Sequence, residues 1–289
     1  MNKNISTFLG CDNDYEDSDI VIFGAPYDGT ASYRPGARFA SAAMRNESYG
    51  IETYSPYQGA DLTDYKIFDG GDLELPYGDS QRTLSMIGEY VTKVMEDKKT
   101  PIMIGGEHLV TLGCVNSVVH KYPNLNIIHF DAHADLRDDY LGCKLSHATV
   151  MRRCHELVGN GRIYQFGIRS GEREEFQWAT NHVTMYPFTF DGLDVTIEKL
   201  SKKEVPIYLT IDLDVLDPRI FPGTGTPEAG GVSFMDLLSA IQKVTKLNVV
   251  ACDINELSPT YDISGVSTIV ACKLLRELLL AISKERKIK

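Results

Sequence analysis

The sequence predicts an α/β protein whose central sheet is mostly parallel and covered by helices on both faces. Short apolar runs alternate along the chain with longer segments of helical periodicity. This alternation is typical of a parallel sheet, because crossover helices connect its strands and bury both of its faces. Clusters of polar side chains directly follow several apolar runs, and sites in such sheets form beyond the carboxyl ends of the strands.

Four of the predicted strands lie in the first half of the chain. Each is a short run of apolar, aromatic and β-branched residues followed by turn-forming residues or acids. These runs cover residues 19–24, 66–72, 101–104 and 127–130.

Helical segments separate these strands. A short helix ends at about Asn46, and an irregular stretch rich in Tyr and Pro follows at 50–64. A longer helix is predicted over 81–97, because Asp79-Ser80 can cap it and its apolar residues recur along one stripe. The next helix reaches about Tyr122.

The second half of the chain continues the alternation, with three more strands and five more helical segments. The predicted strands are 162–168, 205–211 and 248–252. The predicted helices are 145–158, 172–181, 191–202, 233–246 and 265–285. Two loops stand out, one at 136–144 and one rich in Gly and Pro at 217–232. Because no linker or internal repeat interrupts the pattern, we expect one domain over residues 1–289.

The composition is that of a globular protein of 289 residues, with 43% hydrophobic and 24% charged residues. No run approaches the ~20 apolar residues of a membrane span, and the first residues lack the apolar core of a secretory signal. We therefore expect a cytoplasmic protein that does not act at a membrane. The net charge of −11 argues against nucleic-acid binding through a basic surface and is compatible with a cationic substrate.

The six cysteines are scattered without Cys-x-x-Cys spacing, which favours reduced thiols over a disulfide framework or a zinc finger. They are Cys11, Cys114, Cys143, Cys154, Cys252 and Cys272.

The most informative stretch is Asp131-Ala132-His133-Ala134-Asp135, which follows the apolar run at 127–130. In an extended backbone alternate side chains share a face, so these two acids and the histidine would lie together. Such a cluster after a buried strand is costly unless a cation lies among the side chains. Taken alone, the motif fits a solvated loop about as well as a metal site.

A second Asp-x-Asp motif, Asp212-Leu213-Asp214, follows the apolar strand 205–211 and favours the metal site. Two further strand ends carry polar clusters, Gly105-Gly106-Glu107-His108 and Asp253-Ile254-Asn255-Glu256. Four aspartates carry a charge of about −4, which two divalent cations about 3.5 Å apart would balance. Oxygen-rich ligation with imidazole favours Mn²⁺, although affinity alone does not exclude Zn²⁺, Co²⁺ or Ni²⁺. The candidate ligands are His108, Asp131, His133, Asp135, Asp212 and Asp214.

These motifs, in this order, resemble those of the ureohydrolase (arginase/agmatinase) family. The likeness includes the Gly-Gly-Glu-His and Asp-Ala-His-Ala-Asp-Leu-Arg motifs, residues 210–218 and the Pro-Gly-Thr-Gly-Thr-Pro run at 222–227. The early segment Ser32–Phe39 resembles the agmatinase branch in particular. The resemblance implies a three-layer α/β/α arginase-type fold with a central eight-stranded, mostly parallel sheet. It also implies two Mn²⁺ ions per subunit and a homo-oligomer, a trimer or a hexamer.

Carried over position by position, the resemblance divides the ligands between two metals. His108 and Asp135 would bind one ion, His133 and Asp214 would bind the other, and Asp131 and Asp212 would bridge them. One departure from the family is Glu107, where arginases usually have Asp. That position is not a ligand, so the ligand set is unaffected.

The resemblance also implies the catalytic residues. A metal-bridging hydroxide would attack the guanidinium carbon, Asp135 would transfer a proton, and His147 would shuttle protons. Glu256 would pair with the guanidinium through two charge-assisted hydrogen bonds. Without the family, His147 could be an ordinary residue at a helix start and Glu256 an exposed loop acid. Asp253 is expected to organise a strand end.

The loop at 136–144 is predicted to select the substrate. Its acidic and aromatic residues Asp138, Asp139 and Tyr140 resemble those of agmatinases and would repel the carboxylate of arginine. We therefore expect hydrolysis of agmatine to putrescine and urea. Arg137 argues the other way if it faces the pocket, because it could pair with a carboxylate such as that of guanidinobutyrate.

Other substrates and chemistries remain open at this point. Arginine and aminopropylagmatine are alternative guanidino substrates, and aminopropylagmatine would also suit an acidic loop. A single-zinc, deacetylase-like member of the fold or a non-catalytic member is a further alternative. The complete ligand set favours a hydrolase with two metals.

Overall fold

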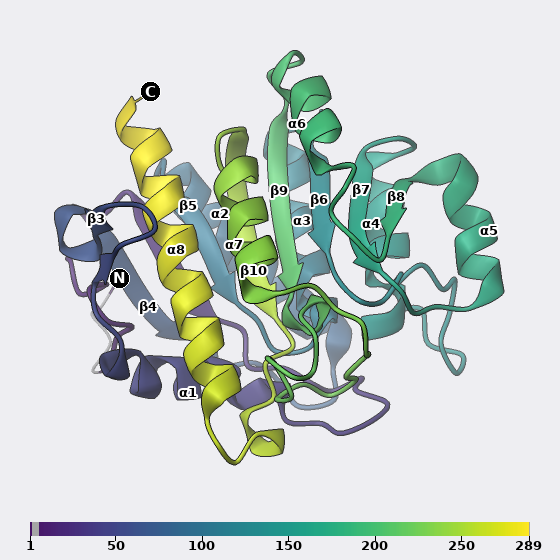
Figure 1. The fold of residues 1–289 in the computed structure, drawn as a ribbon, viewed down its shortest axis with the longest axis horizontal. Coiled ribbons are helices and arrows are strands. Elements are labelled where there is room, and N and C mark those ends of the chain that lie inside the picture. Colours follow the sequence, from purple (N-terminus) through teal and green to yellow (C-terminus); the bar gives the residue numbers. More distant parts are fainter. Residues whose placement is uncertain (2–5, 289) are drawn as a thin grey trace.

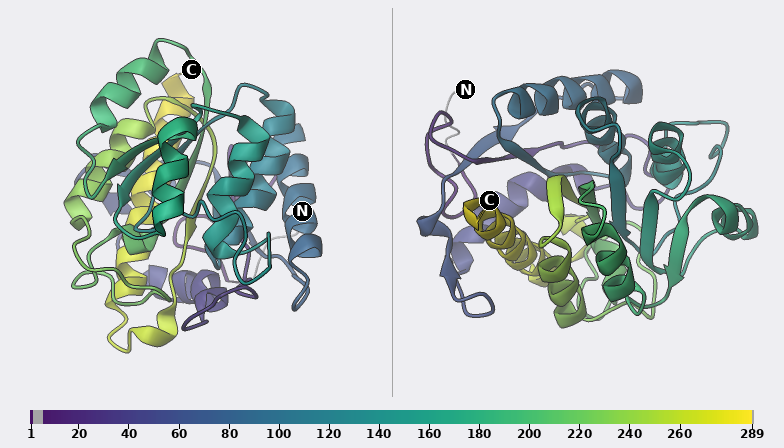
Figure 2. Two further views of the ribbon diagram at one scale, coloured as in Figure 1. Left: turned by 90° about the vertical axis from the view of Figure 1, so that its right-hand side faces the viewer. Right: turned by 90° about the horizontal axis from the view of Figure 1, so that it is seen from above.

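The structure is a computed structural model that describes residues 1 and 6–288. Eight parallel strands form one sheet in the order β4-β1-β5-β10-β9-β6-β7-β8. Helices α2, α3 and α4 cover one face, and α1, α6, α7 and α8 cover the other (Figures 1 and 2). The predicted three-layer α/β/α fold with an eight-stranded parallel sheet is confirmed.

Most element bounds agree with the predicted ones within a few residues. The sheet strands are β1 Ile20–Gly24, β4 Ile67–Asp72, β5 Thr100–Ile104, β6 Asn126–Phe130, β7 Ile163–Ile168, β8 Thr184–Pro187, β9 Pro206–Asp212 and β10 Asn248–Asn255. The helices are α1 Ala40–Glu47, α2 Ser80–Glu96, α3 Thr111–Lys121, α4 Val150–Val158, α5 Arg173–His182, α6 Leu193–Ser201, α7 Phe234–Val244 and α8 Val266–Ile288. The irregular stretch at 50–64 contains a small antiparallel pair, β2 Tyr54–Ser55 and β3 Ala60–Asp61.

The edge strand β8 is the one strand of the large sheet that the residue pattern does not predict. It has four residues, ends in Pro187 and is only partly buried. A short, half-exposed edge strand with a proline carries little of the apolar periodicity that marks a strand.

Strand β10 continues three residues beyond its predicted end at Cys252. The extra residues include Asp253 and Asn255, which are buried polar side chains. Asp253 accepts hydrogen bonds from the hydroxyls of Thr111 and Tyr208, at 2.8 and 2.5 Å, and from the Asn255 amide at 2.7 Å. Burial of these groups is tolerated because they are hydrogen-bonded, and Asp253 organises this strand end as predicted.

The strand order brings the four predicted polar clusters together. They follow β5, β6, β9 and β10, and these strands are neighbours in the sheet, in the order β5-β10-β9-β6. Because all are parallel, their carboxyl ends meet at one edge. The core strands are almost entirely apolar and buried, so the polar groups beyond them stand on a rigid base.

All six cysteines are free, as predicted, and Cys143 is the exposed one. Among the described residues, no helix combines the length and the apolar character that crossing a membrane requires.

Candidate metal centre

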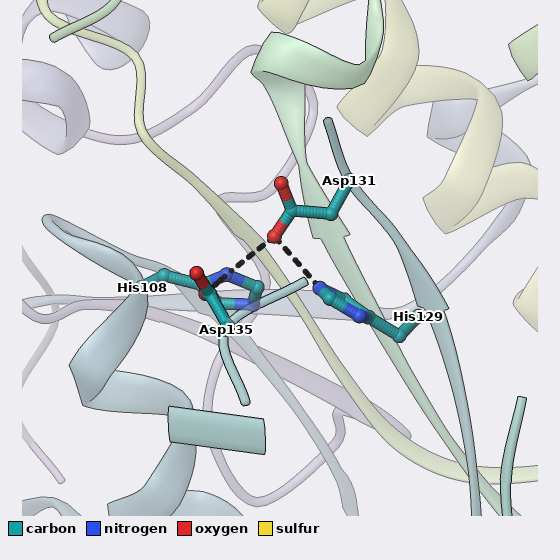
Figure 3. A group of neighbouring side chains, drawn as sticks. All are labelled: His108, His129, Asp131 and Asp135. Carbon is teal, nitrogen blue, oxygen red and sulfur yellow. Dashed lines mark hydrogen bonds and ion pairs between the residues drawn. The ribbon is translucent and has the colours of Figure 1, made fainter. Parts of the chain in front are cut away.

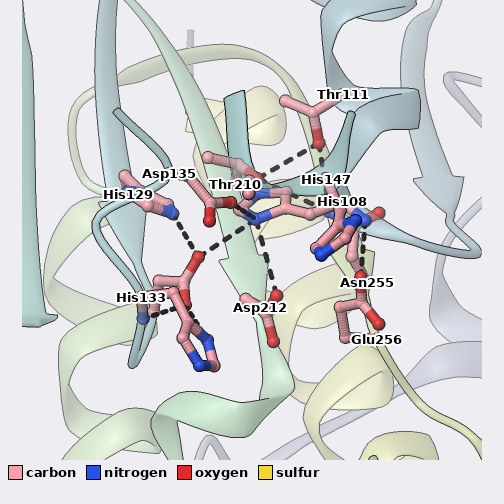
Figure 4. A network of polar contacts seen from close by, with 12 residues as sticks. His108, Thr111, His129, His133, Asp135, His147, Thr210, Asp212, Asn255 and Glu256 are labelled. Carbon is pink, nitrogen blue, oxygen red and sulfur yellow. Dashed lines mark hydrogen bonds and ion pairs between the residues drawn. The ribbon is translucent and has the colours of Figure 1, made fainter. Parts of the chain in front are cut away.

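The imidazole of His108 lies at the centre of a first cluster of side chains, formed with Asp131, Asp135 and Asp212 (Figures 3 and 4). His108 opens a short 3-10 turn after β5, and its backbone N–H donates to Oε1 of Glu256 over 2.8 Å. Its Nδ1 lies 3.0 Å from Oδ2 of Asp131, 3.0 Å from Oδ2 of Asp135 and 3.4 Å from Oδ2 of Asp212. Three carboxylates from two strand ends therefore converge on one ring nitrogen.

The glycines before His108 let the chain pass between neighbouring segments. A Cβ on Gly106 would lie 2.0 Å from the backbone oxygen of Tyr27, and one on Gly105 would lie 1.8 Å from Oδ1 of Asn255. Side chains at these positions would displace the turn that carries His108. The Gly-Gly pair is thus required by close packing.

His133 is the imidazole of the second cluster. Its Nδ1 lies 2.9 Å from Oδ2 of Asp214 and 3.6 Å from Oδ1 of Asp131. The two oxygens of Asp131 therefore face different histidines, Oδ2 toward His108 and Oδ1 toward His133. A carboxylate in this position can bridge two cations.

The side chains meet through turns and not through an extended backbone, which corrects the predicted geometry. Strand β6 ends at Phe130, and Asp135 has a φ of 56°. Oδ1 of Asp131 accepts the backbone N–H of His133 over 2.6 Å. The second motif is similar, because Asp214 lies in a 3-10 turn and its N–H donates to Oδ1 of Asp212 over 2.9 Å. Such Asx turns aim the carboxylates inward.

The electrostatics of the centre fit bound cations. Asp131, Asp135 and Asp212 are buried, and burial followed by the charge of Asp131 raises the pKa of Asp135 to about 7. Burial and the charges of Asp214 and Asp131 raise the pKa of Asp212 well above its usual value.

A cation would relieve this repulsion and would also bind a buried ring nitrogen that lacks a hydrogen bond among the described residues. Nδ1 of His108 is buried and makes no hydrogen bond with the residues that the structure describes. Its Nε2 lies 2.9 Å from the hydroxyl of Thr210, which can accept an N–H and leave Nδ1 unprotonated for a metal. The oxygen-rich donor set with imidazoles suits a binuclear site for divalent cations.

His129 belongs to the site although it was not among the predicted site residues. It is completely buried in β6, and its Nε2 lies 2.8 Å from Oδ2 of Asp131 (Figure 3). Together with His108, Asp131 and Asp135 it forms a group that could hold a metal. The sequence offers one weak signal, the position of His129 two residues before Asp131, but a single histidine inside an apolar strand is usually an ordinary core residue.

A pocket of about 280 Å³ opens onto this centre. Its walls include His108, His133 and Asp135 from the centre, and His147 and Glu256 from the neighbouring segments. The structure thus brings all the predicted catalytic residues to one cavity.

Glu256 is held inward by its own backbone. Its φ is 66°, and its N–H donates to the backbone oxygen of Gly106 over 2.9 Å. Burial, followed by the charge of Glu107, raises the pKa of Glu256 to about 8. The alternative that Glu256 is an exposed loop acid is wrong.

His147 begins a 3-10 turn that is capped by Ser146 and Thr149. Burial lowers the pKa of His147 to about 4, so the ring is neutral at neutral pH. This ring and that of Tyr140 form a T-shaped pair with ring centres 5.7 Å apart. His147 does stand at a helix start, but its side chain lines the pocket.

The predicted substrate loop is only partly in the pocket. Tyr140 lines it, but Asp138 and Asp139 are not among the lining residues. Asp138 pairs with Arg153 over 2.9 Å, and Asp139 accepts the N–H of Gly142 over 3.0 Å. The structure therefore does not bring these two acids to the other site residues.

Arg137 does face the pocket, and it is neutralised there. It lies 3.0 Å from Glu172 and 3.6 Å from Glu175, and its guanidinium lies 4.7 Å from the ring centre of Tyr140. Both glutamates also line the pocket. The acidic character that the sequence suggested for residues 138 and 139 comes instead from the segment after β7.

The sequence profile of the arginase family matches residues 18–281. The chain belongs to the arginase family. An agmatinase from Bacillus anthracis is 48% identical over 94% of this chain and 95% of its own. The N(1)-aminopropylagmatine ureohydrolase of Thermococcus kodakarensis is 35% identical over 90% and 89%. The crystal structure of the agmatine ureohydrolase of Thermoplasma volcanium superposes with a TM-score of 0.91 at 35% identity, over 99% of this chain and 97% of its own.

The family resemblance drawn from the sequence motifs is thereby confirmed, including its agmatinase branch. The relatives named above are agmatinases and ureohydrolases. The His and Asp cluster at the strand ends suits the binuclear metal site that the resemblance implied.

Proposed function

We propose that this chain is a ureohydrolase that converts agmatine to putrescine and urea with two Mn²⁺ ions per subunit. The observation that carries the proposal is the shared carboxylate of Asp131, whose two oxygens face Nδ1 of His108 and Nδ1 of His133. A buried carboxylate between two imidazoles is the arrangement that a pair of bridged cations needs.

His108 and Asp135 would bind one ion, His133 and Asp214 would bind the other, and Asp131 and Asp212 would bridge. When bound, two divalent cations act as Lewis acids and provide a nucleophile from water near neutral pH. A proton on Nε2 of His108, donated to the hydroxyl of Thr210 2.9 Å away, would fix the ring with Nδ1 toward the centre.

The remaining chemistry falls to three side chains of the pocket. The cationic guanidinium would lower the raised pKa of Glu256 and bind it as a carboxylate, and the N–H of His108 fixes one of its oxygens. The alkylamine leaves only when protonated. Asp135 therefore carries a proton toward the leaving nitrogen, and His147, a neutral ring in the wall of the same pocket, exchanges protons with solvent.

The charge of the pocket favours a substrate with two positive groups. Apart from the metal ligands Asp135 and Asp212, three acidic side chains line it against Arg137, the one arginine or lysine among the described lining residues, and Arg137 is already paired with Glu172. The ammonium of agmatine is compatible with such a wall, whereas the carboxylate of arginine is not. The acidic lining residues are Asp135, Glu172, Glu175, Asp212 and Glu256.

Aminopropylagmatine is the second candidate substrate, because a longer cation also suits an acidic pocket and one relative carries that name. The experiment that decides is urea release by the purified protein, with and without Mn²⁺, from agmatine, aminopropylagmatine, guanidinobutyrate and arginine. We expect the highest kcat/KM for agmatine. Faster turnover of arginine would contradict the agmatine proposal.

The same preparation tests the single-zinc alternative. We expect about two metal ions per chain by elemental analysis, and activity that a chelator removes and Mn²⁺ restores. One metal per chain, with no urea from any guanidine, would favour a deacetylase-like member of the fold.

We further propose that residues 1–289 form one domain of a cytoplasmic trimer or hexamer. The continuous sheet and its shared core support the single domain. Light scattering of the purified protein gives the oligomer number.

A further inference from the structure

The loop between β1 and α1 reaches the candidate active site and is fixed at its base. Asp28 is buried and accepts the backbone N–H of Gly36 over 2.8 Å and that of Arg38 over 3.3 Å. The guanidinium of Arg38 also pairs with Asp28. One carboxylate thus ties the two ends of the loop 28–38 together, and the loop includes the agmatinase-like segment.

The far side of the loop rests on the turn after β10. The guanidinium of Arg34 lies 4.1 Å from the ring centre of Tyr261, and the hydroxyl of Tyr261 donates to the backbone oxygen of Pro35 over 3.0 Å. Anchored at the base and at the far side, the loop presents the two hydroxyls of Thr30 and Ser32 to the region of His147.

Thr30 connects His147 to a buried carboxylate. The hydroxyl of Thr30 donates to Oε1 of Glu107 over 2.6 Å, and the N–H of Thr30 donates to Oε2 over 2.9 Å. Because its one hydroxyl proton is committed to Glu107, Oγ1 of Thr30 acts as the acceptor for the backbone N–H of His147, at 3.1 Å. The start of the turn that carries His147 is therefore tied to the Gly-Gly-Glu-His segment.

Ser32 contacts the imidazole itself. Its Oγ lies 3.2 Å from Nε2 of His147, and Oγ of Ser146 lies 3.3 Å from Nδ1. A serine hydroxyl can donate to an unprotonated ring nitrogen and can accept from a protonated one. The contact with Ser32 can therefore persist when His147 gains or loses a proton.

We propose that Thr30 and Ser32 are positioning residues for proton transfer by His147, with Thr30 fixing its backbone and Ser32 its ring. This inference rests on the proposed function, in which His147 moves protons. It gives Ser32, the first residue of the agmatinase-like segment, a task in the reaction.

The test uses the full chain loaded with Mn²⁺ and compares two pairs of variants. Thr30→Val removes the hydroxyl at nearly constant volume, whereas Thr30→Ser keeps it. Ser32→Ala and Ser32→Thr make the same comparison at the ring. We expect Thr30→Val and Ser32→Ala to lower kcat for urea release by about five- to tenfold, with KM changed less than about twofold. The hydroxyl-retaining variants should keep most of the activity.

Two controls separate positioning from a general structural effect. Tyr33→Phe changes an exposed residue of the same loop and should leave kcat and KM unchanged. Mn²⁺ affinity should also be unchanged in all four variants. In addition, Ser32→Ala should shift the acid limb of the kcat–pH profile, which a purely structural role would not move.

A double-mutant cycle gives the sharpest outcome. In a His147→Asn background, Thr30→Val and Ser32→Ala should cause no further loss, because both act through His147. Additive losses there would overturn the inference, as would a raised KM with unchanged kcat in Ser32→Ala. If His147→Asn releases no measurable urea, the kcat–KM comparison and the pH profile decide.

The two proposals fail in different ways. A wild-type protein that releases no urea from any guanidine contradicts the proposed function. An active wild type whose Thr30→Val and Ser32→Ala variants keep full kcat contradicts this inference alone.

Discussion

Nε2 of His129 donates a hydrogen bond to Oδ2 of Asp131 over 2.8 Å, and neighbouring groups determine the direction of this bond. The side-chain amide of Gln165 donates to the backbone oxygen of Ala134 over 2.7 Å and lies 3.0 Å from Nδ1 of His129. Nδ1 therefore accepts a hydrogen bond, and the ring proton is on Nε2. In this tautomer His129 orients Asp131 and is not itself a metal ligand, although it lies within the cluster.

We predict that His129→Phe weakens Mn²⁺ binding by about 10- to 100-fold, because hydrogen bonds behind a ligand hold it in position. Calorimetric titration of Mn²⁺ and the Mn²⁺ dependence of urea release measure the effect. The matched control is His155→Phe on α4, whose ring contacts Asn160 and Trp178. Equal Mn²⁺ affinity in wild type and His129→Phe would contradict this role.

The difference between His129 and the predicted ligands shows what the sequence can reveal. The ligands stand beyond strand ends, where acids after an apolar run are conspicuous, and the strand order β5-β10-β9-β6 then places them together. His129 lies inside an apolar strand, where a single histidine is an ordinary core residue. Its role depends on the neighbouring strand β7, which supplies Gln165, and pairing between strands is not visible in one sequence.

The substrate loop illustrates the opposite error. Asp138 and Asp139 were predicted to face the pocket from their type, their position in the loop and the resemblance of that loop to those of agmatinases. The side chain of Asp138 is directed by its ion pair with Arg153 on α4. The side chain of Asp139 is directed by a local turn, in which it accepts the N–H of Gly142. A loop lacks the periodicity that assigns faces in strands and helices, so composition could predict an acidic rim but not which acids form it.

We predict that Asp131→Asn reduces the metal content from about two ions per chain to at most one. The amide keeps the shape of the side chain but loses the charge that two cations would share, and urea release should fall by more than about a hundredfold. Elemental analysis after dialysis measures the content. Asp194→Asn, at an exposed pair with Lys243 on the surface, is the control and should keep both ions. Two retained ions in Asp131→Asn would show that this carboxylate does not bridge.

His147 should make the metal-free protein sensitive to acid. Burial lowers its pKa from 6.5 to about 4 in the folded protein, so the unfolded chain takes up a proton first as the pH falls. The contribution to the free energy of unfolding is therefore unfavourable below pH 4, and it disappears as the pH rises through 6.5.

Between pH 6.5 and 4, His147→Asn should lose less stability than the wild type. The upper limit of the difference is about 3 kcal/mol, reduced because water reaches part of the ring. Urea denaturation in the presence of a chelator, at several pH values in this window, measures it. Parallel stability curves for the two proteins would contradict the lowered pKa.

The last prediction concerns substrate choice at Glu172, whose carboxylate lies 3.0 Å from the guanidinium of Arg137 in the wall of the pocket. Glu172→Gln leaves the charge of Arg137 less compensated, although Glu175 remains 3.6 Å away. A more positive wall repels the ammonium of agmatine and attracts a carboxylate. We expect KM for agmatine to rise by about three- to tenfold and kcat/KM for guanidinobutyrate to increase. The effect is modest because the charge of Glu172 is partly exposed to solvent. Steady-state kinetics with both substrates measure the change.

Asp138→Asn is the matched control, since its carboxylate pairs with Arg153 and does not line the pocket. If that variant shifts the preference as strongly as Glu172→Gln, the loop at 136–144 selects the substrate after all.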